Sequence, residues 1–284
     1  MVGDRHISSN HTRRSGWTCL YYPDRWLIHR KGLPNLLSTP FLSIVIPAFN
    51  EEKRLPRTLE QVLSFLSTQS YTSEVIVVDN ASQDGTFNLA VEFAHQISSG
   101  SPAFRVVQEA TRGKGAAVRK GMEVAKGEFR FMCDADLSMP ITEVNRFLPP
   151  ILSGIDIAIA SREAPGAIRF NEPSYRHFVG RVFNAQIRLF ALPKLQDTQC
   201  GFKCFRASVA EELFRFQTID GWSFDVELLF IAQRRGYHIL EVPIPWFYNS
   251  ESKVSVFRDS FQMGVDILKI RMNGLLSLYD KKPD

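Results

Sequence analysis

The sequence predicts an α/β protein with a mostly parallel central sheet. Two nearly continuous apolar runs, residues 41–47 and 74–79, have the composition of strands that are buried on both faces. Each run is followed by a segment in which apolar residues recur at the three- and four-residue spacing of a helix. The two patterns continue to alternate along the chain, which is the order expected of parallel strands joined by helices.

The remaining elements follow the same alternation. In chain order we predict a helix at 54–66, a strand at 74–79, a helix at 89–97 and a strand at 104–107, followed by the stretch 111–117 and then a helix to about 125. After these we predict a strand at 129–133, a helix at 141–152, a strand at 156–160, a helix at 175–192, a helix that begins near 221, an edge strand at 241–247 and an amphipathic helix at 257–278. This divides the chain into a poorly ordered extension (1–39), one folded domain (40–253) and a helical tail (254–284).

The composition is that of a globular protein with a mildly basic surface. A net charge of +4 suits an anionic substrate or membrane surface, and it is too small to indicate nucleic acid. The four cysteines lack the paired spacing of zinc sites, so we interpret them as reduced thiols of a cytoplasmic protein. The sequence has neither an apolar run of about 20 residues nor a signal-peptide pattern, so we expect any membrane contact to be peripheral.

Charged residues gather where the predicted strands end. Ligands of parallel α/β sheets bind beyond the carboxyl ends of the strands, where Asn50, Glu51, Asp79, Arg112 and Lys114 fall in this sequence. Asp134 and Asp136 follow the strand at 129–133 and project to the same side if the extended geometry persists. Their mutual repulsion is relieved by a cation, and Mg²⁺ typically takes one or two protein carboxylates together with phosphate oxygens. The same Asp-x-Asp pattern also occurs in ordinary polar loops. It indicates a site here because other charged residues follow the neighbouring strand ends.

An ordered set of short stretches resembles family-2 inverting glycosyltransferases, in the branch that includes the dolichyl- and polyprenyl-phosphate β-glucosyltransferases. The matching stretches are 46–52 (IPAFNEE), 77–86 (VVDNASQDGT), 112–115 (RGKG), 134–136 (DAD), 197–203 (DTQCGFK), 222–227 (WSFDVE) and 252–253 (SK). Each stretch is a weak signal alone, whereas their common order is specific.

The resemblance implies a GT-A fold, which is a single Rossmann-like domain with a mostly parallel sheet and helices on both faces. It also implies a nucleotide-sugar donor and Mg²⁺ or Mn²⁺. The residues it assigns to donor binding are Pro47, Asn50, Glu51, Asp79, Asp84, Lys114 and Asp134. Those it assigns to the metal are Asp134 and Asp136. Those it assigns to catalysis are Asp134, Asp136, Asp225, Arg162 and Arg176, with Arg162, Arg176 and Arg181 facing the acceptor phosphate.

The expected reaction moves a hexose, foremost glucose from UDP-glucose, onto a polyprenyl phosphate of the dolichyl or undecaprenyl type at the cytoplasmic membrane surface. A glycan or soluble hydroxyl acceptor, GDP-mannose as donor, and a binding protein without catalysis remain as alternatives, and the oligomeric state stays open. A phosphate acceptor is already ionised and needs no base, whereas a hydroxyl would need a carboxylate such as Asp197 or Asp225. Helix capping or loop hydrogen bonding is the alternative role for Asp197, Asp225 and Glu227, and core packing is the favoured role for Trp222.

Overall fold

The computed structural model describes residues 17–22, 25–30, 39–97, 102–249 and 256–280, which fall into two units, 1–38 and 39–284. In the first unit β1 (Trp17–Tyr22) and β2 (Arg25–Arg30) pair as an antiparallel hairpin, where the sequence analysis predicted no regular element. The second unit contains everything described below.

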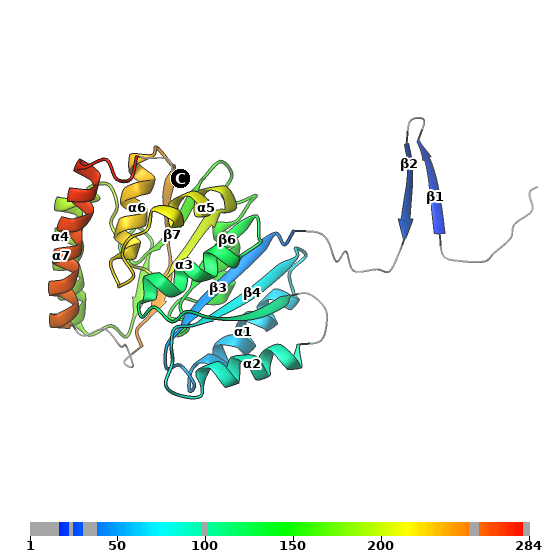
Figure 1. Ribbon diagram of the computed structural model, residues 1–284, viewed down its shortest axis with the longest axis horizontal. Helices are drawn as coiled ribbons and strands as arrows, with labels where there is room; N and C mark the ends of the chain where they lie inside the picture. Colours follow the sequence, from blue (N-terminus) through cyan, green and yellow to red (C-terminus); the bar gives the residue numbers. More distant parts are fainter. Residues whose placement is uncertain (1–16, 23–24, 31–38, 98–101, 250–255, 281–284) are drawn as a thin grey trace, which may run out of the picture. The chain divides into compact units, whose positions relative to one another are not determined.

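The second unit is built on a seven-stranded sheet in the order β10-β7-β9-β6-β3-β4-β5 (Figure 1). The strands are β3 (Leu42–Ala48), β4 (Ser73–Asp79), β5 (Ala103–Gln108), β6 (Phe129–Cys133), β7 (Ile157–Ser161), β9 (Phe202–Arg206) and β10 (Ile239–Pro243). Neighbouring strands are parallel except where β9 pairs antiparallel with β6 and β7. The predicted mostly parallel α/β sheet is confirmed.

Helices cover both faces of this sheet. They are α1 (Leu55–Ser67), α2 (Thr86–Gln96), α3 (Lys114–Val124), η1 (a 3₁₀ helix, Ile141–Phe147), α4 (Ser174–Phe190), α5 (Ala207–Phe216), α6 (Phe224–Arg234) and α7 (Val256–Leu275). Alternate strand residues point into two separate cores: Val45 and Met132 pack with α3, α5 and α6, whereas Ile44 and Phe131 pack with α1, α2 and η1. Helices α4 and α7 lie side by side at one end of the unit (Figure 1).

Two predicted elements differ from the structure because prolines end or divide them. The predicted helix at 141–152 is the shorter η1, which ends at Phe147 just before Pro149 and Pro150. The predicted edge strand at 241–247 is divided into β10, which does lie at a sheet edge, and β11 (Pro245–Phe247). Strand β11 pairs instead with β8 (Ile168–Phe170) in a small separate sheet, because Pro243 and Pro245 have no N–H group to extend one ladder.

Strand β9 and helix α5 were not predicted. The segment 197–203 reads as a polar turn, but Phe202 and Lys203 already belong to β9. Lys203 is 1% exposed, so a charged residue lies inside a buried strand and breaks the apolar pattern that identifies the other strands. None of the helices in the described part of the chain is long and apolar enough to cross a bilayer.

Candidate active site

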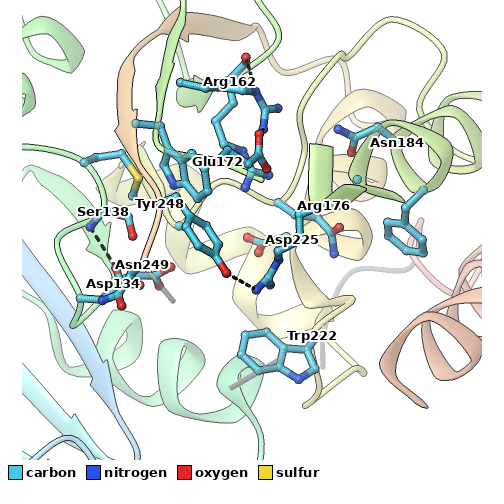
Figure 2. Close-up of a pocket in the computed structure, with 18 of the residues that line it drawn as sticks. Asp134, Ser138, Arg162, Glu172, Arg176, Asn184, Trp222, Asp225, Tyr248 and Asn249 are labelled. Atoms are coloured by element: carbon cyan, nitrogen blue, oxygen red, sulfur yellow. Dashed lines mark hydrogen bonds and ion pairs between the residues drawn. The ribbon is translucent and has the colours of Figure 1, made fainter. Parts of the chain in front are cut away.

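A cavity of about 270 Å³ lies beyond the carboxyl end of β6, bounded by α3, α4, α6 and the small β8–β11 sheet (Figure 2). It brings together residues from widely separated segments of the chain. Those that the sequence analysis predicted are Lys114, Asp134, Asp136, Arg162, Arg176 and Asp225. These six residues therefore line one pocket.

The acidic pair differs in how its two carboxylates are balanced. Asp134 Oδ1 lies 2.6 Å from the Lys114 ammonium, whereas Asp136 Oδ1 accepts a hydrogen bond from the backbone N–H of Ser138 at 3.0 Å. Among the described residues no ion pair holds the Asp136 carboxylate, and its hydrogen bonds come from Ser138. Burial, and after it the Asp134 carboxylate, raises the pKa of Asp136. Asp134 is therefore in contact with a cation, and Asp136 is not.

Lys114 reaches this pair because it is the first residue of α3. The preceding Gly113 has φ +139°, and a Cβ there would lie 2.0 Å from the carbonyl oxygen of Asp220, so only glycine allows the turn. Burial would lower the pKa of the Lys114 ammonium, but the carboxylates around it, Asp134 first, raise it overall. Lys114 is therefore a permanent cation, and its Nζ also lies 5.5 Å from the ring centroid of Trp222.

Gly201 packs directly on the Asp134 side chain. The backbone N–H of Asp134 donates to the Gly201 carbonyl at 3.1 Å, which ties the start of the acidic loop to the residue before β9. A Cβ at Gly201 would lie 1.8 Å from Asp134 Oδ2, and real Cβ atoms do not approach other atoms so closely. The carboxylate can keep its place beside Lys114 only if residue 201 has no side chain.

We therefore expect Gly201→Ala to lower turnover about 100-fold, because the new methyl group displaces the Asp134 carboxylate from Lys114 and from any metal. The loss should appear in steady-state transfer rates and in a weakened affinity for Mn²⁺. Gly221→Ala is the matched control, because nothing lies within 4 Å of a Cβ at that position. Unchanged activity in Gly201→Ala would contradict the tight packing described here.

Asp225 forms a buried ion pair rather than an open carboxylate. Its Oδ1 lies 2.7 Å from the Lys203 ammonium, which also donates to the Cys200 carbonyl at 2.6 Å. Asp225 is 3% exposed. Burial raises the pKa of Asp225, against the lowering effect of Lys203 and Lys114. The pair joins the first turn of α6 to β9 beneath the cavity.

Arg162 is held by Asp197 at three points. Its Nε and Nη2 donate to the two carboxylate oxygens at 2.7 and 2.9 Å, and its backbone N–H donates at 2.9 Å. Although burial opposes ionisation, the Arg162 guanidinium holds the pKa of Asp197 at about 2. Asp197 is therefore an anchor for Arg162, in line with the loop hydrogen-bonding role, and it is too weakly basic to activate a hydroxyl.

Arg162, Arg169 and Arg176 line one part of the cavity, which we call the arginine wall. Two aromatic side chains contact these arginines. Trp246 lies against both Arg162 and Arg169, whose guanidinium carbons are 5.5 and 5.8 Å from its ring centroid. Arg176 Nη1 donates to the Tyr248 hydroxyl at 3.3 Å, and Figure 2 shows the two side chains pointing toward one another across the cavity. The wall therefore carries three arginines, of which Arg162 is paired with Asp197, and Arg169 with Glu163 and Glu172.

Five of the residues predicted to bind the donor lie outside the cavity lining. Pro47 is in β3, Glu51 pairs with Arg54 through Nε at 2.6 Å, and Asp84 accepts from the backbone N–H of Thr86 at 3.0 Å at the start of α2. Asn50 Oδ1 accepts from the Gln83 N–H at 2.8 Å, which joins the two loops after β3 and β4. The fifth, Asp79, is 2% exposed, and among the described residues its Oδ1 has no hydrogen-bond partner.

Other functional residues were missed or given a different role. Arg181, expected with the acceptor-facing arginines, is exposed on α4 and does not line the cavity. Trp222 lines the cavity and is 36% exposed, so the core-packing interpretation is wrong. Glu227 accepts from the Thr218 and Ile219 backbone N–H groups, both at 2.9 Å, as a loop anchor. The cavity residues that the sequence analysis missed include Arg169, Glu172, Asn184, Trp246 and Tyr248.

The donor set fits a divalent cation that is shared with a diphosphate. The described residues contain no cluster of three or more His, Cys, Asp or Glu that could hold an ion unaided. They do contain two carboxylates two positions apart, one of which, Asp136, forms no ion pair with a cationic side chain among them. One or two protein carboxylates together with phosphate oxygens is the usual arrangement for Mg²⁺.

The chain is similar in sequence to glycosyltransferases over most of its length. Residues 43–214, more than half of it, match the glycosyl transferase family 2 domain. It is 34% identical to the dolichyl-phosphate beta-glucosyltransferases of Mus musculus and Homo sapiens, covering 91% and 89% of this chain and 85% and 83% of theirs. It is 32% identical to the Saccharomyces cerevisiae protein of that name, over 88% of this chain and 81% of that one.

Solved structures resemble it in fold. One is glucosyl-3-phosphoglycerate synthase of Mycobacterium tuberculosis, with a TM-score of 0.57 at 19% identity over 86% of this chain and 82% of that one. The same enzyme with Mn²⁺, UDP-glucose and phosphoglyceric acid also matches at a TM-score of 0.57 and 18% identity, over 86% of this chain and 81% of that one. This structural similarity shows that the chain has the GT-A fold. The domain match, the curated relatives and this fold together show that the chain is a hexosyltransferase that belongs to glycosyl transferase family 2.

Proposed function

We propose that this protein transfers glucose with inversion from UDP-glucose to a polyprenyl phosphate, using Mg²⁺ or Mn²⁺. The observation that carries the proposal is the composition of one cavity. It has an acidic pair in which Lys114 contacts Asp134 while Asp136 has no ion-pair partner among the described residues, and it has an arginine wall. Such a cavity can receive a diphosphate at one end and a second phosphate at the other. The shared name of the curated relatives supports the lipid phosphate as acceptor.

The acidic end of the cavity would receive the donor. Mg²⁺ or Mn²⁺, when held by Asp136 and Asp134, would neutralise the departing diphosphate as a Lewis acid. Lys114 contributes a further fixed cation to the same diphosphate, since its position is set by Gly113 and its ion pair with Asp134. The partnerless Oδ1 of Asp79 is the acceptor atom that we assign to the nucleoside of the donor.

The other residues predicted to bind the donor have an indirect role in this proposal, because they hold loops next to the donor site. The side chain of Asn50 joins the loops after β3 and β4, next to Pro47 and to the Glu51–Arg54 pair. Asp84 fixes the start of α2 beside them. These contacts would shape the rim on which the nucleoside rests, without touching the diphosphate.

The arginine wall would position the acceptor. A phosphate monoester has a second pKa near about 6, so at neutral pH its oxygen is already a nucleophile. This oxygen attacks the anomeric carbon of glucose on the face opposite UDP, the bond to UDP breaks, and UDP leaves. Arg176, oriented by Tyr248, and Arg162, oriented by Asp197, supply guanidinium groups at this wall. Asp225 acts as a positioning residue because it is buried and paired with Lys203.

A transfer assay with three acceptors tests this proposal. Purified protein, Mg²⁺ and labelled UDP-glucose are incubated with a short polyprenyl phosphate, with the corresponding polyprenol, and with a phosphorylated soluble hydroxy acid. We expect label only on the polyprenyl phosphate, and much slower transfer when GDP-mannose replaces UDP-glucose. Label on the soluble hydroxy acid would favour the hydroxyl-acceptor alternative, to which the phosphoglyceric acid bound by the structural neighbour lends weight. Bound donor without transfer to any acceptor would indicate a non-catalytic binding protein.

We expect Arg176→Ala to raise the KM for the polyprenyl phosphate about tenfold or more, with little change in the KM for UDP-glucose, because a charge-assisted contact to the acceptor is lost. Arg181→Ala is the matched control from the same helix, since this residue is exposed and does not line the cavity. Equal effects of the two substitutions, or an effect of Arg176→Ala on the donor alone, would contradict the assignment.

A further inference from the structure

Helices α4 and α7 present an apolar outer surface that the fold leaves uncovered. On α4, Tyr175, Val182 and Leu189 recur every seven residues and are 65%, 45% and 76% exposed. Helix α7 has a second exposed apolar stripe. Its members Val265, Leu268, Met272 and Leu275 are 46%, 63%, 59% and 80% exposed. Single exposed apolar residues are common on proteins, but seven of them on two neighbouring helices are characteristic of an interaction surface. We call these seven residues the α4–α7 face.

The inner sides of the same two helices belong to the fold and to the cavity. Ile187, Ile267 and Ile270 are buried in the core. Val179 and Phe183 of α4, together with Met263 of α7, line the cavity beside Arg176. Arg176 and Asn184, which belong to the same helix α4, also line the cavity (Figure 2). The apolar wall of the cavity and the exposed apolar face therefore belong to the same two helices.

Among the side chains of α4 and α7 that the structure describes, the exposed charges are all positive. Helix α4 contains no Asp or Glu, and its Arg181 and Arg188 are exposed. On α7, Lys269 and Arg271 are exposed, whereas Asp266 is buried and accepts from Gln262. Two copies joined through this face would bring these cations together without an acidic partner among the described residues of the face. A bilayer with anionic head groups would supply the missing countercharge.

We infer that the α4–α7 face is the surface by which this protein docks on an anionic lipid bilayer, with the two helices lying flat in the interface. The inference rests on the proposed function in one respect: a lipid-linked acceptor would then enter the cavity past Val179, Phe183 and Met263, with its phosphate at Arg176. The docking itself depends only on the exposed side chains and charges of the two helices.

Vesicle flotation with purified protein tests the docking. The wild type should bind vesicles of phosphatidylcholine with phosphatidylglycerol, and bind pure phosphatidylcholine more weakly. The double variant Leu268→Glu with Leu275→Glu should lose binding about tenfold or more, because both apolar contacts are replaced by anions. Ile151→Glu is the matched control: this residue is 62% exposed but follows η1, which packs on the opposite face of the sheet. Replacing Arg188 and Lys269 by Gln should abolish most of the preference for anionic vesicles.

Two further readouts separate the explanations. The Glu double variant should keep its thermal transition and its transfer rate to a short water-soluble polyprenyl phosphate, and should lose transfer to a long-chain acceptor embedded in vesicles. Docking is overturned if wild type and double variant bind vesicles equally, or if the substitutions convert a dimer to a monomer while vesicle binding is absent in both. If the wild type transfers to no acceptor, the proposed function fails, and the flotation result still decides the docking.

Discussion

Asp136→Asn should reduce turnover about 10³-fold, the largest effect expected of any single substitution in this chain, and equivalent to about 4 kcal/mol of transition-state stabilisation. The reason is that the Asp136 carboxylate has no ion-pair partner among the described residues, so it is available to a divalent cation, whereas Asp134 is already paired with Lys114. An amide of the same shape cannot supply that charge. The rate is measured by steady-state transfer at saturating donor and acceptor, with Mn²⁺ varied.

Asp84→Asn is the matched control for this experiment. It removes a carboxylate that the sequence analysis also assigned to the donor, but that the structure places at the start of α2, where it accepts from Thr86. We expect a small loss of stability and turnover within a factor of about three of the wild type. A normal rate in Asp136→Asn, with the thermal transition preserved, would exclude this carboxylate from metal binding.

Lys203→Met should lower the free energy of unfolding by about 3–5 kcal/mol, because it leaves the buried Asp225 carboxylate without its cation. The double variant Lys203→Met with Asp225→Leu should recover most of this loss, since both buried charges are then absent. Equilibrium urea unfolding at neutral pH measures both values. Transfer activity should remain low in the double variant, because the anchor between α6 and β9 beneath the cavity is missing.

The surface pair Arg146–Glu143 provides the control for the buried pair. Its distance of 2.6 Å is similar, but the Arg146 side chain is 41% exposed. Arg146→Met should therefore change the free energy of unfolding by less than about 1 kcal/mol. If Lys203→Met costs no more than Arg146→Met, the ion pair beneath the cavity has no structural role. If the double variant is less stable than Lys203→Met alone, Asp225 is held by contacts other than Lys203.

The sheet could be predicted from the sequence because its parallel strands are buried on both faces. The strand at 129–133 has the predicted bounds, and the strands near 41–47 and 74–79 are each within one residue. Their continuous apolar runs admit few other structures. β9 was missed because Lys203, which is neutralised by a residue 22 positions later, resembles a surface residue in the sequence. The position of Lys203 between the apolar residues Phe202 and Cys204 was the one feature of the sequence that could have indicated this strand.

The acidic end of the cavity could be predicted because its residues follow strands whose ends must meet. Asp134, Asp136 and Lys114 come together for that reason. The arginine wall depends on partners that spacing does not reveal: Asp197 for Arg162, and Tyr248 for Arg176. The same limit applies to Glu51 and Asp84, whose pairing with Arg54 and Thr86 could not be read from a motif.

Crystals soaked with UDP and Mn²⁺ test the central claim most directly, because the anomalous signal of manganese locates the ion without reference to activity. The account predicts one strong peak in the cavity, in contact with a carboxylate oxygen of Asp136, with the diphosphate of UDP on its other side and near Lys114. A peak at any other place, or UDP bound with its diphosphate away from Asp136, would contradict it.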